Sequence, residues 1–139
     1  DRDILMQNGV KKVIIFEGVN DIGAARSGSS ETVARQIIES IQGMMKKAKA
    51  RKMKVYLGTI TPFKGAGYYT HFHEAARLYV NDWIRSQARN VDGILDFAKL
   101  LQDPNDDRRM KREYASSDWL HPNPTGYKAM GIYAADIVK

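Results

Sequence analysis

The sequence has no cysteine among its 139 residues. A chain without thiols cannot form a disulfide-stapled fold, a thiolate zinc site or a cysteine nucleophile. No apolar run approaches the roughly 20 residues that a membrane-spanning helix requires, so we expect no membrane span. The chain also opens without methionine and without the basic and apolar stretches of a secretory leader. Because the apolar residues 4–6 are followed by Asn8-Gly9, a helix-stop signal, we expect the chain to begin in the tail of a helix, as part of a longer protein.

Composition and charge narrow the class of protein. Hydrophobic residues make up 43% and charged residues 27%, which is typical of a globular domain and excludes collagen-like or wholly disordered chains. Lys and Arg number 22 against 16 Asp and Glu, which gives a net charge of +6. The basic cluster at 46–54 ends a helical pattern and contains no aromatic residue, so we expect no nucleic-acid partner. A positive net charge weakly favours acidic substrates.

Strand and helix patterns alternate along the chain. Short apolar runs bounded by turn residues are typical of strands buried on both faces of a sheet, and they lie at 13–16, 54–61 and 91–97. Apolar residues at helical spacing predict helices at 33–48, at 76–84 (Ala76, Tyr79, Val80, Trp83 and Ile84 on one side) and at 124–137 (burying Tyr127, Met130, Ala134 and Ile137). This alternation predicts an α/β fold with a parallel sheet covered on both faces.

Polar segments follow each predicted strand, at 18–23, 62–73 and 96–121. We expect 18–23 to be a glycine-punctuated loop and the very polar stretch 103–113 to be a surface loop. Ligands of parallel α/β sheets bind beyond the carboxyl ends of the strands. The sequence therefore predicts a functional site at this edge.

The sharpest local motif is Asp118-Trp119-Leu120-His121. An Asp three residues before a His can accept a hydrogen bond from Nδ1, which leaves Nε2 available as a general base. The alternative is a surface Asp and a His held by turn contacts. The following Pro122, Asn123 and Pro124 favour the first interpretation, because they set a rigid turn at a helix entrance.

A second motif, Gly18-Val19-Asn20-Asp21, directly follows the first predicted strand. An Asn side-chain N–H at the end of a strand can donate to a developing oxyanion. Alternatively, Asn20 and Asp21 only form a turn and satisfy their own backbone.

Together the two motifs resemble those of the SGNH hydrolases, also called the GDSL esterase/lipase family. Gly18-Val19-Asn20-Asp21 is similar to the family's GxND block, and Asp118-Trp119-Leu120-His121 is similar to its DxxH block. Stretches at 61–69, 74–77 and 81–85 are similar to a bacterial subgroup of these esterases. The resemblance covers essentially the whole chain and implies a flavodoxin-like, three-layer αβα fold.

The resemblance also implies a role for each motif residue. His121 would be the general base, Asp118 would orient and stabilise it, and Asn20 would donate to the oxyanion. Gly18 would permit the tight loop beside the substrate, and Asp21 would brace that loop. The implied reaction is hydrolysis of short-chain acyl or carbohydrate O-acetyl esters through an acyl-serine intermediate, with no cofactor.

The sequence departs from the family at the nucleophile. The family carries its serine in a Gly-Asp-Ser block after the first strand, and a second block supplies an oxyanion-hole glycine; neither block is present here. We therefore expect 1–139 to be the C-terminal part of a single SGNH hydrolase domain whose N-terminal segment carries the nucleophile. Three strands without their sheet partners would leave an apolar edge, which that segment or self-association would cover. The alternative is a non-catalytic fragment or a hydrolase fold used only for binding.

Weaker signals lie in the segment 62–73. Tyr68 and Tyr69, with two neighbouring Phe residues, form an aromatic loop that we expect to contact substrate; the alternative is that the rings pack over the core. His71 and His73 have no recognisable third ligand nearby, so we expect no metal site. The sequence does not fix the compartment, with a secreted or periplasmic location slightly favoured over a cytoplasmic one.

Overall fold

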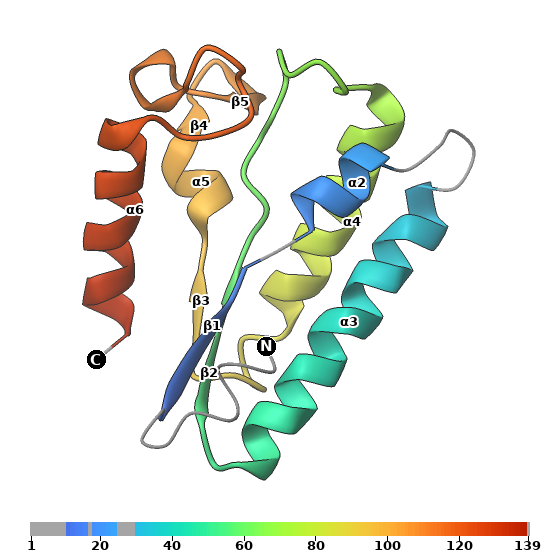
Figure 1. Cartoon of the computed structure of the whole chain (residues 1–139), viewed down its shortest axis with the longest axis vertical. Coiled ribbons are helices and arrows are strands. Elements are labelled where there is room, and N and C mark those ends of the chain that lie inside the picture. Colours follow the sequence, from blue (N-terminus) through green and yellow to red (C-terminus); the bar gives the residue numbers. More distant parts are fainter. Residues whose placement is uncertain (1–10, 17, 25–29, 139) are drawn as a thin grey trace.

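Figure 1 shows the computed structural model of the chain, which describes residues 11–16, 18–24 and 30–138, except for the side chains of Asn20 and Ala24. The helix tail predicted before Asn8 lies outside these residues. Two serines of the sequence, Ser27 and Ser29, also lie outside them. No helix among the described residues combines the length and the apolar character that crossing a membrane requires.

Three parallel strands form the central sheet, which confirms the predicted fold class. They are β1 (Lys12–Ile15), β2 (Lys54–Gly58) and β3 (Gly93–Leu95), in the order β1-β2-β3. Ile14 pairs with Tyr56, and Tyr56 pairs with Gly93 across the next ladder. Because all three strands run the same way, their carboxyl ends meet at one edge, from which the predicted site segments emerge.

Helices α2 (Val19–Ala24), α3 (Ser30–Ala50) and α4 (His71–Ser86) cover one face of the sheet (Figure 1). The predicted apolar stripe of α3 is present, and its buried residues are Ala34, Ile37, Ile38, Ile41, Met45 and Ala48. The predicted buried side of α4 was partly wrong, because Tyr79 is 41% exposed. The buried side of α4 is rotated from the predicted one and includes the polar residues Glu74, Arg77 and Asn81.

The buried polar residues of α4 brace the chain beyond β2. Asn81 accepts a hydrogen bond from the Ile60 amide (2.7 Å) and donates one to the Ile60 carbonyl (2.9 Å). Arg77 forms a buried ion pair with Glu74 (2.6 Å) and also donates to the Ile60 carbonyl (3.4 Å). The side chain of Asn81 thus replaces a neighbouring strand as the partner of Ile60. This explains why β2 ends at Gly58 while the chain stays buried beyond it.

Helix α6 (Pro124–Ile137) lies against the other face, and α5 (Phe97–Leu101) follows the carboxyl end of β3 and packs beside α6. Asn123 begins α6 as an N-cap, because its side chain accepts from the Gly126 amide (2.8 Å). Met130 is buried as predicted, but Tyr127 is 52% exposed, so its predicted burial was wrong. Tyr127 lies on the side of α6 that no described element covers.

Strand β1 was predicted to be buried on both faces, and the structure corrects this. Ile15 is buried, whereas Ile14 and the adjacent Phe16 are 43% and 44% exposed. The physical reason is position: β1 is an edge strand that pairs only with β2 among the described residues, and α6 lies over β3 rather than over β1. The ring of Phe16 meets Phe97 edge to face, with centroids 5.1 Å apart, beside Gly58.

The polar stretch 103–113, predicted to be a loop, contains an antiparallel hairpin and a 3-10 turn. Strand β4 (Gln102–Asp103) pairs with β5 (Asp106–Met110), and the turn η1 spans Arg112–Tyr114. Side chains alternate between the two faces of β5, and Met110 is fully buried on one of them. The carboxylate of Asp106 forms ion pairs with Arg108 and Lys64. The ion pairs at Asp106, the pair between Arg109 on β5 and Asp103 on β4, and one buried Met therefore order a segment whose polarity alone predicts a loop.

Candidate functional site

Asp118 and His121 lie in a short loop between η1 and α6. The ends of this loop are pinned together, because the Ser116 amide donates to the His121 carbonyl (3.0 Å) and Ala115 bridges to Pro122. Within it, the Trp119 amide donates to the Ser116 carbonyl (3.0 Å), and Trp119 takes a positive φ of 57°. Hydrogen bonds at both ends therefore fix the backbone on which the Asp and the His are presented.

The Asp118 carboxylate is held through both of its oxygens. Oδ1 accepts from the backbone amides of Leu120 (2.9 Å) and His121 (3.0 Å), and Oδ2 lies 2.8 Å from Nδ1 of the His121 ring. These hydrogen bonds, led by the one from the His121 ring, lower the pKa of Asp118 to about 2. The carboxylate is therefore ionised at neutral pH, and its half-exposed side chain also favours the charged form.

An ionised carboxylate can only accept hydrogen bonds, so the hydrogen between the two side chains belongs to Nδ1 of His121. In the neutral ring, Nε2 then carries a lone pair and no hydrogen, which is the form required of a general base. The hydrogen bond expected from the Asp-x-x-His spacing is present. The catalytic roles of the two residues stay a prediction at this point.

The second motif begins at a buried glycine with a positive φ of 122°. A β-carbon on Gly18 would lie 3.0 Å from Cδ1 of Ile60 and 3.2 Å from Cγ2 of Ile37, so a larger residue would meet both conformational strain and a crowded wall. The Ile22 amide donates to the Gly18 carbonyl (3.0 Å), which starts helix α2 directly after the glycine.

The segment predicted to be a loop at 18–23 is therefore largely the helix α2. Its fully buried Ile22 fixes it against the core. Asn20 occupies the first turn of α2, and its side chain lies outside the described part of the structure. Asp21 is exposed in the same turn. Their predicted roles, oxyanion donor and loop brace, stay predictions.

Tyr68 links the two motif-bearing segments. Its hydroxyl donates to the Val19 carbonyl in α2 (3.3 Å), and its ring packs edge to face on Phe63 with centroids 5.6 Å apart. Burial raises the pKa of Tyr68, and the negative charge of Asp118 raises it further. Tyr68 therefore contacts the first turn of α2 directly and is influenced by the charge of Asp118.

Tyr69 also packs on Phe63, with ring centroids 5.4 Å apart, and its hydroxyl oxygen is buried with no hydrogen-bond partner among the described residues. The rings of Tyr68 and Tyr69 thus pack as the alternative interpretation of this loop expects. Their predicted contact with substrate is not tested by the geometry.

His71 and His73 occupy the first turn of α4. His73 is buried, and its Nδ1 is paired with the Tyr68 carbonyl. His71 is exposed. Across the part of the chain that the structure describes, no three His, Asp or Glu side chains are grouped in a way that could hold a metal ion.

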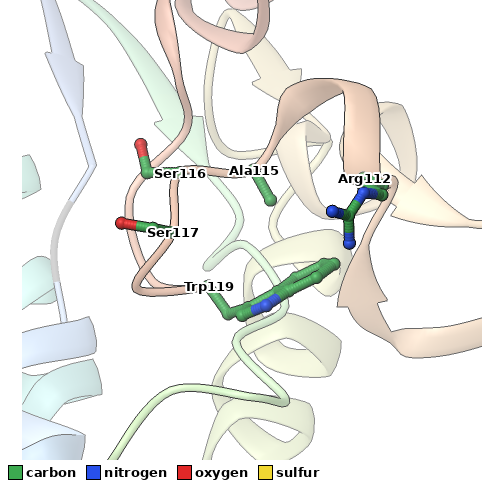
Figure 2. A pocket seen from close by; sticks show the side chains of 5 residues that line it. All are labelled: Arg112, Ala115, Ser116, Ser117 and Trp119. Atoms are coloured by element: carbon green, nitrogen blue, oxygen red, sulfur yellow. The ribbon is translucent and has the colours of Figure 1, made fainter.

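A pocket of about 390 Å³ is formed by residues of η1 and of the loop that carries Asp118 and His121, and Figure 2 shows the side chains that line it. It is lined by Arg112, Ala115, Ser116, Ser117 and Trp119. Sequence reasoning did not single out Arg112, which sits in a polar run, or Trp119, which appears there only as a spacer inside the Asp-x-x-His motif. The signal that could have marked the tryptophan is its place between two candidate catalytic residues.

The serines of the described chain do not complete a triad. No serine hydroxyl in these ranges is hydrogen-bonded to His121. Ser116 and Ser117 are near it in sequence, and Figure 2 shows their hydroxyls pointing to the side away from Ala115 and Trp119. The described residues therefore present a base and its orienting carboxylate, without an attached nucleophile.

A family model for the GDSL-like lipase/acylhydrolase family matches residues 2–129. No curated protein sequence matches the chain. Among solved structures, a protein assigned to the lipolytic G-D-S-L family from Desulfitobacterium hafniense is 27% identical, with a TM-score of 0.74 over 99% of this chain and 70% of that one.

Two more distant structures share the fold. A GDSL-like lipase from Bacteroides thetaiotaomicron is 20% identical, with a TM-score of 0.71 over 89% of this chain and 60% of its own. A lipolytic G-D-S-L family member from Veillonella parvula is 21% identical, with a TM-score of 0.64 over 91% of this chain and 62% of its own. The chain thus spans about three fifths of the length of these two.

Proposed function

The chain belongs to the GDSL-like lipase/acylhydrolase family, and from this premise we propose that it supplies the base and the oxyanion donor of a serine ester hydrolase. Family membership supports the coarser statement, a hydrolase of ester substrates. The observation that carries the finer proposal is the 2.8 Å hydrogen bond between Asp118 and Nδ1 of His121. A His fixed in this way has one nitrogen committed and the other prepared to accept a proton.

In the proposed reaction, Nε2 of His121 takes the proton of a serine hydroxyl as the serine oxygen attacks the ester carbonyl. The protonated ring then gives that proton to the departing alcohol, and Asp118 stabilises the positive charge in between. In the second step a water molecule attacks the acyl-serine while His121 accepts its proton. The ring then returns this proton to the serine oxygen, and the carboxylic acid is released. Asn20, held behind Gly18 at the start of α2, donates to the oxyanion in both steps.

We place the nucleophilic serine outside this chain, on an N-terminal segment of the same protein. The sequence has no Gly-Asp-Ser block, and β1 has a second edge without a partner among the described residues. Beside that edge Ile14 and Phe16 are more than two fifths exposed. An open strand edge flanked by apolar side chains favours a further strand docking there.

The substrates that we propose are short-chain acyl esters or carbohydrate O-acetyl esters. The half-exposed Asp118–His121 pair suits an ester on a polar, accessible group. The chemistry needs no cofactor, because the triad supplies both the nucleophile and the proton transfers.

A fluorophosphonate probe, which reacts with activated serines, tests where the nucleophile lies. The purified protein is labelled, and the intact mass of every polypeptide is recorded. We expect the label on a polypeptide or segment that carries Gly-Asp-Ser, and none on residues 1–139. Label on a serine of 1–139 would refute the external nucleophile.

His121→Ala in the full-length protein tests the base. We expect turnover of 4-nitrophenyl acetate to fall by about three orders of magnitude or more, because loss of a triad member removes the proton transfers. His71→Ala is the matched control, since His71 is an exposed histidine on α4, outside the Asp118 loop. Undiminished turnover in His121→Ala would refute His121 as the base, and no turnover in the wild type would favour a hydrolase fold used only for binding.

A further inference from the structure

We propose that the pocket lined by Arg112, Ala115, Ser116, Ser117 and Trp119 binds a carboxylate-bearing sugar residue of the ester substrate. The inference rests on the proposed ester-hydrolase function and adds to it a substrate class, an acylated acidic carbohydrate. It is carried by a guanidinium that has no ion-pair partner among the described residues, by an indole packed against Gly65, and by the loop that joins this pocket to the Asp118–His121 pair.

The pocket holds about 390 Å³, which is enough for one sugar ring and its substituents. In Figure 2 the Arg112 guanidinium and the far end of the Trp119 indole lie on the same side, and the methyl group of Ala115 points between them. A ligand in this space would meet a cation, an aromatic surface and a small apolar group.

Among the three arginines at 108–112, Arg112 is the one that forms no ion pair with a carboxylate of the described residues. On the adjoining hairpin, Arg108 is paired with Asp106 (2.9 Å) and Arg109 with Asp103 (3.0 Å). Arg112 has no ion pair or side-chain hydrogen bond to any other described residue, and it is exposed. Its planar fork of N–H donors is therefore available, and a carboxylate is the group that matches this fork in charge and geometry.

Trp119 is held in place by its surroundings. Its positive φ of 57° lies in a region that bulky residues seldom occupy. A β-carbon on Gly65, whose φ is 104°, would come within 2.8 Å of Cγ of the indole, so the glycine leaves room for the ring. Arg109 lies over the same ring, 5.9 Å from its centroid. A ring fixed in this way offers a preformed apolar surface to the C–H face of a sugar.

The pocket and the proposed base share one loop. Trp119 directly follows Asp118, and the Ser116 amide is bonded to the His121 carbonyl. A sugar seated in the pocket would thus be held by the loop that also presents the proposed base. A carboxylate bound by Arg112 would therefore favour ester substrates that contain an acidic sugar over those that contain only neutral sugars.

Binding to the full-length protein tests the inference without any hydrolysis, because the probes carry no acyl ester. The probes are methyl glucuronide, which carries a carboxylate, and methyl glucoside, its neutral counterpart. The readout is the indole N–H resonance of Trp119 in the ¹⁵N-labelled protein, which is assigned as the signal that Trp119→Phe removes. We expect a saturable shift with methyl glucuronide and affinity for methyl glucoside weaker by about tenfold or more, because only the carboxylate forms charge-assisted hydrogen bonds with Arg112.

Arg112→Gln should remove this preference, so that both sugars bind with the weaker affinity. Arg89→Gln is the matched control, because Arg89 is an exposed arginine in the turn between α4 and β3, at the amino ends of the strands. Equal affinity of the wild-type chain for both sugars, no saturable shift with methyl glucuronide, or an unchanged preference in Arg112→Gln would each overturn the inference. Failure of the proposed hydrolase function would show instead in the turnover of His121→Ala.

Discussion

Asn81→Ala tests how the chain beyond β2 is held. Asn81 is 1% exposed, and its side chain satisfies both the amide and the carbonyl of Ile60. The substitution leaves the Ile60 amide buried without a partner, while the carbonyl keeps only the long contact from Arg77 (3.4 Å). We therefore expect the loss of this one buried side chain to lower the free energy of unfolding substantially.

The size of the loss follows from these two bonds. A buried polar group left without a partner costs about 1–3 kcal/mol. The unpaired Ile60 amide contributes this full cost. The Ile60 carbonyl contributes less, because it still accepts the hydrogen bond from Arg77. We expect the free energy of unfolding of Asn81→Ala to fall by about 2–4 kcal/mol. Asn81→Leu, which refills the space without restoring the bonds, should recover little of that loss.

Urea unfolding followed by circular dichroism measures these differences at constant m-value. Asn90→Ala is the matched control, because Asn90 is exposed and bonds only within its own turn. We expect the control to change stability by about 0.5 kcal/mol or less. A loss in Asn81→Ala no larger than in the control, or full recovery in Asn81→Leu, would refute the reasoning.

Two other predictions concern single polar groups. Tyr69→Phe removes a hydroxyl that is buried without a partner, so we expect urea unfolding to show unchanged or higher stability, by up to about 1 kcal/mol; a clear loss would mean that the hydroxyl has a partner. The pKa of Asp118 is lowered to about 2 from 3.8, so its stabilising bond to His121 should be complete above pH 3.8 and lost as the pH falls through about 2. The carboxyl ¹³C shift of Asp118 should titrate with a midpoint near 2, and a midpoint near 4 would contradict the geometry.

Local patterns in the sequence predicted the central sheet and its main helices. The helical stripe of α3 and the N-cap at Asn123 depend on residues a few positions apart, so they can be recognised without tertiary information. The same is true of the hydrogen bond between Asp118 and His121, whose three-residue spacing brings them together within one loop.

The errors arose where distant contacts decide the structure. Helix α2 was predicted to be a loop because Asn20 and Asp21 favour turns, but Ile22 is buried and the Tyr68 ring lies against Gly23 from far along the chain. Tyr127 was predicted to be buried because its spacing fits the apolar stripe of α6. Which side of that stripe is covered depends on neighbouring elements, and spacing does not report it.

The pocket beside the site was missed for the same reason. Arg112 differs from Arg108 and Arg109 on β5 because it has no ion pair with a described carboxylate. The Trp119 indole fits where it does because Gly65, more than fifty positions earlier, leaves space for it. Both features depend on tertiary contacts, so the local sequence does not predict them.

Gly58, at the end of β2, has a consequence for how sequences of this kind can diverge. A β-carbon there would lie 3.0 Å from the rings of both Phe16 and Phe97, which meet beside it. Even an alanine would require the two rings to shift by a few tenths of an ångström. Positions 16, 58 and 97 are therefore coupled, so that the effect of a substitution at 58 depends on the size of the side chains at the other two.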